Sequence, residues 1–406
     1  MKSENKQMDR RTFLKATGAG GASLAISSGL AGNVLASEKT KDTPVKTIPT
    51  RILGKSGLPV SILSLGGIDW TTNQNLLRLS FTYGATFWDT SDRYENGKSE
   101  IGIGQYLTRY PEDRKKIFIC TKASEKTDPK QVSESIDQSL DRMKTDYIDL
   151  YLLTLLPNVD KLPDDLKTLV EKKKKEGKIK AVGFSGHLGN DKIVDKAVTM
   201  GWIDALMITY NYILMQKDEV KKQIDAAAKA GIGLIAIKSM GKGPDMVETP
   251  EALAATKHFM DKGYTLEQAK LKAVWSDERI ASICSEITNV TILKDNVAAA
   301  TDNVKLSSTD LNVFELLAEG ECRHYCQGCG KCISVMGAET RVPDIMRYMM
   351  YYNSYGERDR ARNLYRELPG TLRNSLASRD YSSAEAVCPH GLQIGKLMRM
   401  ASNLLA

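Results

Sequence analysis

Short apolar runs rich in β-branched and aromatic residues recur at regular intervals along the chain, and turn-forming or polar residues bound each of them. Between successive runs lie segments whose apolar spacing suits helices, such as residues 129–144 and 163–176. Strands that alternate with helices in this way predict a (β/α)8 barrel. The predicted strands are residues 60–66, 85–91, 116–122, 147–154, 179–185, 204–211, 232–239 and 280–286.

Two different patterns precede the first of these strands. Residues 37–50 are polar and contain Pro44 and Pro49, which predicts a linker. Residues 51–60 alternate around a glycine-containing turn, which predicts a β-hairpin.

The first 36 residues have the pattern of a targeting signal. A charged stretch with Arg10-Arg11 is followed by a weakly apolar run rich in Gly, Ala and Ser, which ends at Ala36. This run lacks the ~20 strongly apolar residues of a spanning helix, so a membrane anchor is disfavoured. A twin-arginine signal peptide is predicted instead, and with it export of the folded protein to the periplasm by the twin-arginine machinery. An accidental arginine pair before a flexible leader is the alternative.

The charge balance excludes one class of partner. The chain has a net charge of +7, of which five basic and two acidic residues in residues 1–36 contribute +3, so about +4 remains afterwards. A charge this small is not the footprint of a nucleic-acid-binding protein. The basic run Lys172–Lys175 precedes Gly177 and predicts a solvated helix end.

Three residues suited to proton transfer stand at or near the ends of consecutive predicted strands. Asp89 ends the run that begins at Phe87, Tyr94 follows five residues later, and Lys122 ends the next run. Because barrel enzymes carry their chemistry at the carboxyl ends of strands, we expect these side chains to meet. A lysine near a phenol lowers the phenol pKa, and an acid keeps that lysine charged and oriented. The alternative is three ordinary polar residues at strand ends.

The pattern Phe-x-Asp-x-x-x-x-Tyr with a later strand-end Lys resembles the aldo/keto reductases, TIM-barrel enzymes that move a hydride between a nicotinamide cofactor and a carbonyl. The resemblance implies that Tyr94 is the general acid, assisted by Lys122 and Asp89, and that the hairpin closes the barrel bottom. Where the family has a fourth catalytic residue, a histidine, this chain has Thr154. His187, after the fifth strand, either partly replaces that histidine or satisfies loop backbone.

The same resemblance implies a site for the cofactor. Ser185 would bind the nicotinamide amide, Tyr210 or Tyr212 would stack on the ring, and Met207 replaces a customary glutamine. Glu286 and Ile292 occupy the positions of basic residues that hold the 2′-phosphate of NADP. Because a carboxylate disfavours phosphate but accepts hydrogen bonds from ribose hydroxyls, NAD(H) is expected over NADP(H). The residues implied for the pyrophosphate are Gly241 and Gly243, and those implied for the adenine are Asp295 and Asn296.

The cysteines are concentrated near the carboxyl end of the chain. Five of the seven lie after residue 321, with short spacings and a final Cys-Pro. An odd number of closely spaced cysteines favours metal ligation by thiolates over disulfides. A zinc ion is the alternative. These cysteines are Cys322, Cys326, Cys329, Cys332 and Cys388.

The spacing resembles a two-cluster ferredoxin from which one cluster has been lost. In such ferredoxins each Cys-x2-Cys-x2-Cys run takes its fourth ligand from the Cys-Pro of the other run. Met336 stands at the fourth position of the first run, and Ser378, Tyr381 and Ala384 stand at the first three positions of the second. One ligand set remains for a single [4Fe–4S] cluster, and Cys322 is left as a packed thiol or a substitute ligand. The remaining set is Cys326, Cys329, Cys332 and Cys388.

These observations predict a four-part organisation. A stripe of Tyr and Met in residues 345–352 predicts packing between a helical carboxyl-terminal domain and the barrel. The whole resembles iron–sulfur aldo/keto reductases with twin-arginine signals. The predicted parts are a signal peptide (1–36), a linker (37–50), a barrel (51–304) and a ferredoxin-like iron–sulfur domain (305–406).

Two functions follow from this organisation. The first is a periplasmic oxidoreductase that acts on a small carbonyl or alcohol and exchanges electrons with a periplasmic partner through its cluster. The second is a non-catalytic or electron-relay protein, in which a degenerate barrel is a scaffold for the cluster domain. Three of the four expected catalytic residues are present, which favours the first function.

Overall fold

The computed structural model describes residues 47–67, 71–155, 159–186, 190–245 and 247–406, and Lys46–Ala406 form one compact unit. The predicted signal peptide and most of the predicted linker lie outside the described residues, and so does His187.

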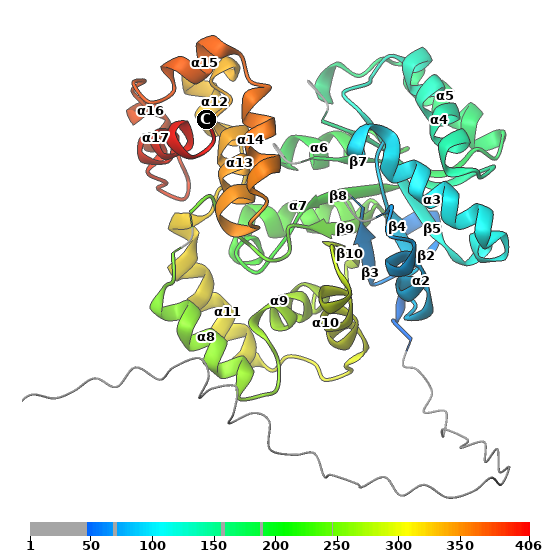
Figure 1. Ribbon diagram of the computed structural model, residues 1–406, viewed down its shortest axis with the longest axis horizontal. Helices are drawn as coiled ribbons and strands as arrows, with labels where there is room; N and C mark the ends of the chain where they lie inside the picture. Colours follow the sequence, from blue (N-terminus) through cyan, green and yellow to red (C-terminus); the bar gives the residue numbers. More distant parts are fainter. Residues whose placement is uncertain (1–46, 68–70, 156–158, 187–189, 246) are drawn as a thin grey trace, which may run out of the picture. The chain divides into compact units, whose positions relative to one another are not determined.

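Eight parallel strands close into a barrel in the order β10-β3-β4-β5-β6-β7-β8-β9 (Figure 1). Each predicted barrel strand overlaps one of them, so the predicted (β/α)8 barrel is confirmed. The barrel strand that begins at Phe118 continues to Ser124, which places Lys122 two residues before its end. The barrel strands are β3 (Leu63–Gly66), β4 (Phe87–Asp89), β5 (Phe118–Ser124), β6 (Ile148–Thr154), β7 (Ile179–Ser185), β8 (Ala205–Thr209), β9 (Gly233–Ile237) and β10 (Ile280–Glu286).

A hairpin closes one end of this barrel. Strands β1 (Thr50–Ile52) and β2 (Pro59–Ser61) pair antiparallel, as the alternation predicts. Leu53 and Val60 are buried with the side chains that fill the barrel. The amide of Lys55 donates to the carbonyl of Gly231, just before β9, so the hairpin lies at the amino ends of the strands. The carboxyl ends of the strands therefore remain available for a site.

Most of the helices up to residue 301 cover the barrel wall with an apolar face, whereas Pro250–Met260 packs with the later helix Ser308–Glu321. In α4, Asp128 caps the first turn, Pro129 opens the helix, and Val132 and Ile136 are buried against the barrel. None of the helices in the described ranges is both long and apolar enough to span a membrane. The helices up to residue 301 are α2 (Gln74–Thr82), α3 (Lys98–Arg109), α4 (Pro129–Met143), α5 (Asp165–Lys175), α6 (Asn190–Met200), α7 (Asp218–Lys229), α8 (Pro250–Met260), α9 (Leu266–Trp275) and α10 (Val290–Thr301).

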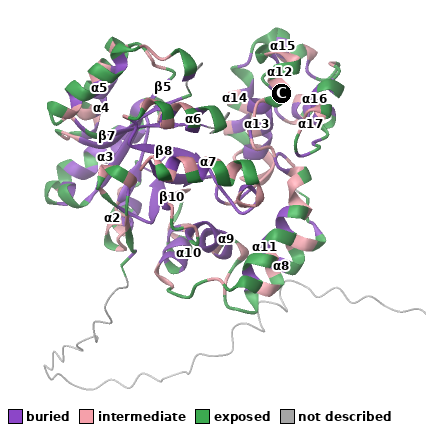
Figure 2. Ribbon diagram, turned by 180° about the vertical axis from the view of Figure 1, so that it is seen from behind, coloured by how far each residue is buried: buried purple, intermediate pink, exposed green. Residues whose placement is uncertain are grey.

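The rest of the chain is helical, as predicted. Ile345, Met346 and Met349 of α13 join the core of these helices, and Figure 2 shows much of α13 buried. The Tyr and Met stripe therefore packs mainly within this segment, and only its far end reaches the barrel. These helices are α11 (Ser308–Glu321), α12 (Lys331–Met336), α13 (Val342–Ser354), α14 (Arg358–Arg366), α15 (Gly370–Ser375), α16 (Ser382–Ala386) and α17 (Ile394–Leu404).

Candidate functional site

A cavity of about 640 Å³ opens at the carboxyl ends of the barrel strands, and it is termed the central cavity below. Its volume is typical of small-molecule sites, which measure roughly 300–1,000 Å³. Strand ends form its floor, and the loop after β9 contributes to its wall. The carboxyl-terminal helical segment supplies Met350, Tyr351, Tyr355 and Arg360 to the lining.

Most of the site residues predicted from the sequence meet in this cavity. Seven of them line it, namely Asp89, Tyr94, Lys122, Thr154, Ser185, Asp295 and Asn296. Asn296 also donates from Nδ2 to Ser285 Oγ at 3.0 Å, which holds its side chain at the carboxyl end of β10.

Three predicted cofactor residues are not brought to the cavity. The hydroxyl of Tyr210 instead donates to Asp277 Oδ2 at 2.6 Å, on the outer side of the barrel wall. Gly241 faces the ring of Tyr212, which would lie 2.6 Å from an added Cβ. An added Cβ on Gly243 would lie 1.7 Å from the carbonyl oxygen of His324, so this glycine permits close packing of backbone.

Lys122 and Asp89 form a buried ion pair on neighbouring strands. Lys122 Nζ donates to Asp89 Oδ1 at 2.5 Å and to the carbonyl of Thr90 at 2.8 Å, and the side chains of Lys122 and Asp89 are only 4% and 3% exposed. The same ammonium lies 5.0 Å from the centre of the Tyr94 ring. Asp89, Lys122 and Tyr94 therefore lie together at the cavity floor, as expected from their positions near strand ends.

Burial sets the protonation of this group. It raises the pKa of Tyr94 well above its usual value, and the opposing effect of Lys122 is smaller. The predicted lowering by lysine is therefore present but outweighed. For Lys122, burial lowers the pKa, but Asp89 and Tyr94 reverse this and raise it overall. At neutral pH the site holds a protonated phenol beside an ammonium, which suits proton donation.

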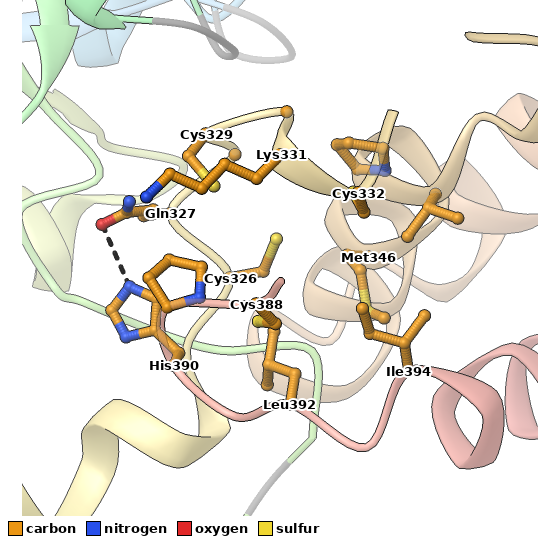
Figure 3. A pocket seen from close by; sticks show the side chains of 15 residues that line it. Cys326, Gln327, Cys329, Lys331, Cys332, Met346, Cys388, His390, Leu392 and Ile394 are labelled. Atoms are coloured by element: carbon orange, nitrogen blue, oxygen red, sulfur yellow. Dashed lines mark hydrogen bonds between the residues drawn. The ribbon is translucent and has the colours of Figure 1, made fainter. Parts of the chain in front are cut away.

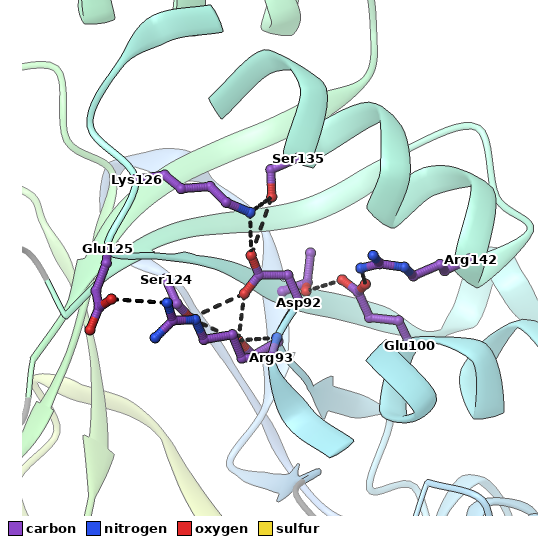
Figure 4. A network of polar contacts seen from close by, with 10 residues as sticks. Asp92, Arg93, Glu100, Ser124, Glu125, Lys126, Ser135 and Arg142 are labelled. Carbon is purple, nitrogen blue, oxygen red and sulfur yellow. Dashed lines mark hydrogen bonds and ion pairs between the residues drawn. The ribbon is translucent and has the colours of Figure 1, made fainter. Parts of the chain in front are cut away.

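The loop that carries Tyr94 is anchored by Asp92 (Figure 4). Asp92 accepts hydrogen bonds from Lys126 Nζ at 2.7 Å and from Ser124 Oγ at 3.1 Å. The amide of Asp92 donates to the carbonyl of Lys122 at 3.2 Å. These bonds connect the loop that carries Tyr94 to β5, the strand that carries Lys122.

The two residues after Tyr94 have left-handed backbone conformations, with φ of 48° at Glu95 and 57° at Asn96. Such conformations are uncommon outside glycine, although asparagine adopts them more readily than most residues. The turn directly follows Tyr94, whose side chain lines the cavity.

Thr154 occupies the position where a histidine is implied. Its hydroxyl donates to the carbonyl of Ser185 at 3.1 Å, across the β6–β7 pair. No histidine is found among the described residues that line the cavity. Among the described residues, a threonine hydroxyl therefore stands where the resemblance implies an imidazole.

Sequence reasoning missed several side chains of the central cavity, among them Lys238, Cys284, Tyr351 and Arg360. Arg360 Nη1 lies 3.3 Å from Glu286 Oε1, so the carboxylate assigned to a ribose is already paired with a guanidinium. The two residues are 74 positions apart, and no local pattern links them. Lys238 and Cys284 could have been found, because each lies within the last three residues of a predicted strand.

A second pocket brings together the predicted cluster ligands Cys326, Cys329, Cys332 and Cys388, and it is termed the cysteine pocket (Figure 3). Apolar side chains such as Met346 and Ile394 form much of its wall. Gly328 and Gly330 have φ of 70° and 75°, which lets the chain turn tightly between the first three cysteines. The fourth arrives from a loop 56 residues later and meets the others only in the folded chain.

The thiols in this pocket are partly withdrawn from water. Burial raises the pKa of Cys326 to about 12 and that of Cys332 to about 11. Thiolates would therefore need the positive charge of a bound metal. Among the described residues, no group of three or more His, Cys, Asp or Glu is placed so that it could hold a metal ion.

Cys322 lies apart from the cysteine pocket. Its Sγ donates to the carbonyl of Glu319 at 3.3 Å, and it packs beside a different apolar cluster that contains Phe314 and Tyr325. This environment is that of a packed thiol.

Comparison with known proteins finds relatives for two parts of the chain. The aldo/keto reductase family matches residues 61–301, and the twin-arginine translocation pathway signal sequence matches residues 7–27. The chain is similar to L-galactose dehydrogenase of Arabidopsis thaliana, with 25% identity over 300 residues, which cover 67% of this chain and 94% of the dehydrogenase. It is similar to the uncharacterized oxidoreductase YqkF of Bacillus subtilis, with 25% identity over 285 residues, 62% of this chain and 90% of YqkF.

The fold is shared with a solved structure. The holo form of aldo-keto reductase AKR11C1 from Bacillus halodurans superposes with a TM-score of 0.56 and 21% identity, over 66% of this chain and 96% of that one. The family match contains the barrel and the Asp89, Tyr94 and Lys122 group, and it ends before the carboxyl-terminal helices.

Proposed function

This chain belongs to the aldo/keto reductase family and carries a twin-arginine signal sequence, and from this premise we propose that it is a periplasmic oxidoreductase that interconverts a small carbonyl compound and its alcohol. The observation that carries the proposal is the Tyr94 phenol beside the buried Lys122–Asp89 pair, at the floor of a cavity of about 640 Å³. Such a cavity at the carboxyl ends of barrel strands is where barrel enzymes act.

Tyr94 is the proton donor in this proposal. In the reducing direction its hydroxyl gives a proton to the carbonyl oxygen, and the O–H bond of the alcohol forms as the phenolic O–H bond breaks. Lys122 stabilises the phenolate that results, and Asp89 holds Lys122 in its charged form. Thr154 is smaller than histidine and leaves more room beside the reacting carbonyl.

A nicotinamide nucleotide would supply the hydride, and the lining of the central cavity is compatible with one. Ser185 would bind the carboxamide, and Asp295 and Asn296 would bind the adenosine end. We favour NAD(H) over NADP(H), because neither Glu286 nor Ile292 offers a cation to a 2′-phosphate. The nearby Arg360 is already paired with Glu286 and with Glu357, at 3.3 and 2.5 Å.

We also propose that the cysteine pocket holds one [4Fe–4S] cluster, which would supply one-electron transfer to or from a periplasmic partner. The proposal is supported by the four cysteines that line one apolar pocket, three of them in a Cys-x2-Cys-x2-Cys run and the fourth directly before a proline, a spacing typical of cluster ligation. The ligands would be Cys326, Cys329, Cys332 and Cys388.

Turnover by the purified, exported protein tests the proposal. A panel of aldehydes, ketones, sugars and alcohols is offered with NAD or with a dye as the electron acceptor. Turnover that depends on Tyr94 supports the oxidoreductase. A protein whose cluster accepts and releases electrons while no compound is turned over would instead be the electron-relay scaffold.

A further inference from the structure

Lys238 follows β9 directly, and its side chain lines the central cavity. Its Nζ lies 5.9 Å from the centre of the Tyr351 ring on α13. Among the described residues, this nitrogen has no hydrogen-bond or ion-pair partner, whereas Lys122 in the same cavity is paired with Asp89. The two lysines therefore differ in what their amino groups are free to do.

The backbone at Lys238 turns the side chain into the cavity. Ile235 and Ile237 face the barrel interior, so continued alternation would direct residue 238 outward. Lys238 instead has a φ of 55°, in the left-handed region that is uncommon outside glycine. The carbonyl of Lys238 accepts hydrogen bonds from Asn211 Nδ2 and from the amide of Gly241, each at 3.1 Å, which hold this conformation.

The carboxylates of the cavity are placed elsewhere. Apart from Asp89, the carboxylates among the described lining residues are Glu267, Glu286, Asp295 and Glu357. Glu286 and Glu357 lie 3.3 and 2.5 Å from Arg360 Nη1. None of the four forms an ion pair with Lys238 in the described part of the chain. The amino group of Lys238 is therefore not held in its charged form by an adjacent carboxylate, as that of Lys122 is.

The surroundings of Lys238 favour the neutral amine. Burial has the largest effect, and together with the guanidinium groups of Arg347 and Arg360 it lowers the pKa of Lys238 to about 7. Cys326 and Glu286 raise this pKa, but by less. At pH 7 about half of the Lys238 side chains are therefore uncharged, whereas a lysine with the ordinary pKa of about 10.4 is almost wholly protonated. A desolvated lysine beside other cations is a nucleophile towards carbonyl groups.

We propose that Lys238 is a nucleophile that binds aldehydes and unhindered ketones covalently, as an imine, in the central cavity. The lone pair of Nζ attacks the carbonyl carbon, and the carbonyl oxygen becomes a hydroxyl by taking up the proton that the nitrogen releases. The resulting carbinolamine loses water, and a C=N bond joins the ligand to Lys238. The reaction needs no oxidant, reductant or hydride.

This covalent binding is separate from the proposed proton donation by Tyr94. Tyr94 follows β4 and Lys238 follows β9, and two strands, β10 and β3, lie between them in the barrel. Both side chains line the same cavity, so a carbonyl compound that enters it meets either group. Lys238 thus adds a second way of binding the same class of compound, and this way requires no cofactor.

Reductive trapping tests the proposal. The exported protein, as purified and with any group that its cysteine pocket holds, is incubated with propanal and sodium cyanoborohydride at pH 7. Cyanoborohydride gives a hydride to the imine carbon and converts the reversible adduct into a stable propyl-lysine, which is located by mass spectrometry of peptides. Lys238 is expected to react on the order of 10- to 100-fold faster than the exposed Lys222 on α7, because more of it is neutral. A Lys238 that is modified no faster than Lys222 would overturn the proposal.

Two variants serve as controls. Lys238→Met replaces the amine by an apolar side chain of similar length, so the fast modification should vanish while the melting temperature stays at or above that of the wild type. Tyr94→Phe should leave the rate of Lys238 modification unchanged. The two proposals therefore fail separately. Modification of Lys238 in a protein that turns over no carbonyl compound refutes only the oxidoreductase, and turnover by a protein whose Lys238 is not modified refutes only the imine.

Discussion

Lys122 Nζ lies 2.5 Å from Asp89 Oδ1, and this ion pair joins two neighbouring strands at the floor of the central cavity with both side chains almost wholly buried. The pair fixes the position of the ammonium beside Tyr94. It also means that Asp89 and Lys122 contribute to stability as well as to the proposed chemistry, which the predictions below separate.

Replacement of Tyr94 by phenylalanine removes the proposed proton donor and keeps the ring. The rate of turnover is expected to fall about 10²- to 10⁴-fold, the usual contribution of one general acid. Steady-state kinetics of wild type, Tyr94→Phe and the control Tyr83→Phe, at the end of α2, measure this. An unchanged rate in Tyr94→Phe would assign the chemistry to another group.

Replacement of Lys122 by methionine is expected to reduce turnover as strongly as Tyr94→Phe, because the phenolate loses its cation. It also leaves Asp89 buried without a partner, which costs about 3–5 kcal/mol of the free energy of unfolding. Asp89→Asn should slow turnover less. The double variant Lys122→Met/Asp89→Asn should regain stability over Lys122→Met, as measured by urea unfolding. A double variant no more stable than Lys122→Met would show that the ion pair is not the source of the loss.

Replacement of any one ligand cysteine by serine tests the cluster. Cys326→Ser, Cys329→Ser, Cys332→Ser and Cys388→Ser are each expected to abolish visible iron–sulfur absorption. Cys322→Ser, whose thiol lies outside the cysteine pocket, should keep about four irons per chain, as in one cubane cluster. The reverse pattern, with iron lost in Cys322→Ser and kept in Cys388→Ser, would refute the ligand assignment.

The identity of a retained nucleotide tests the cofactor proposal. No pool of free nucleotide is expected outside the cytoplasm, so the cofactor would be exported inside the folded protein and released slowly. Denatured periplasmic protein is expected to release NAD, detected by an enzymatic assay of the supernatant. Release of NADP would contradict the interpretation of Glu286 and Ile292, and release of no nucleotide would favour the scaffold function.

Asp302 provides a test of stability that is independent of function. Burial alone would raise its pKa, but Lys272 and Tyr264 donate to it at 2.8 and 2.6 Å and hold its pKa at about 2. A carboxyl group whose pKa is lowered by folding stabilises the folded state above its unfolded pKa of about 4, and this stabilisation is lost as the pH falls towards 2.

Asp302→Asn is therefore expected to lower the free energy of unfolding by roughly 1–2 kcal/mol at pH 7. The difference from wild type should shrink as the pH falls from about 4 to about 2, when followed by urea unfolding. Asp218→Asn is the matched control, because its side chain is 84% exposed and its partner Lys221 lies 3.5 Å away, so a change of at most about 0.5 kcal/mol is expected. A difference that grows at low pH would contradict the assigned direction of the shift.

The strands, the hairpin and the meeting of Asp89, Tyr94 and Lys122 could be predicted from the sequence. Strand patterns are local, and parallel strands in a barrel bring their carboxyl ends to one rim. The alternation of side chains along β8 also indicates where Tyr210 points. Met207 faces the barrel interior, so Tyr210, three positions later, falls on the opposite face and donates to Asp277.

Only the tertiary structure decided which side chains of the carboxyl-terminal segment line the cavity and whether Tyr94 at its floor is protonated. Arg360 reaches Glu286 across 74 positions of sequence, and Lys238 enters the cavity because its backbone leaves the strand alternation with a φ of 55°. The sequence alone could not give the direction in which the pKa of Tyr94 shifts. That direction depends on whether burial or the neighbouring ammonium of Lys122 has the larger effect on the pKa. Local sequence sets the period of each element, whereas burial and long-range packing depend on which elements come together.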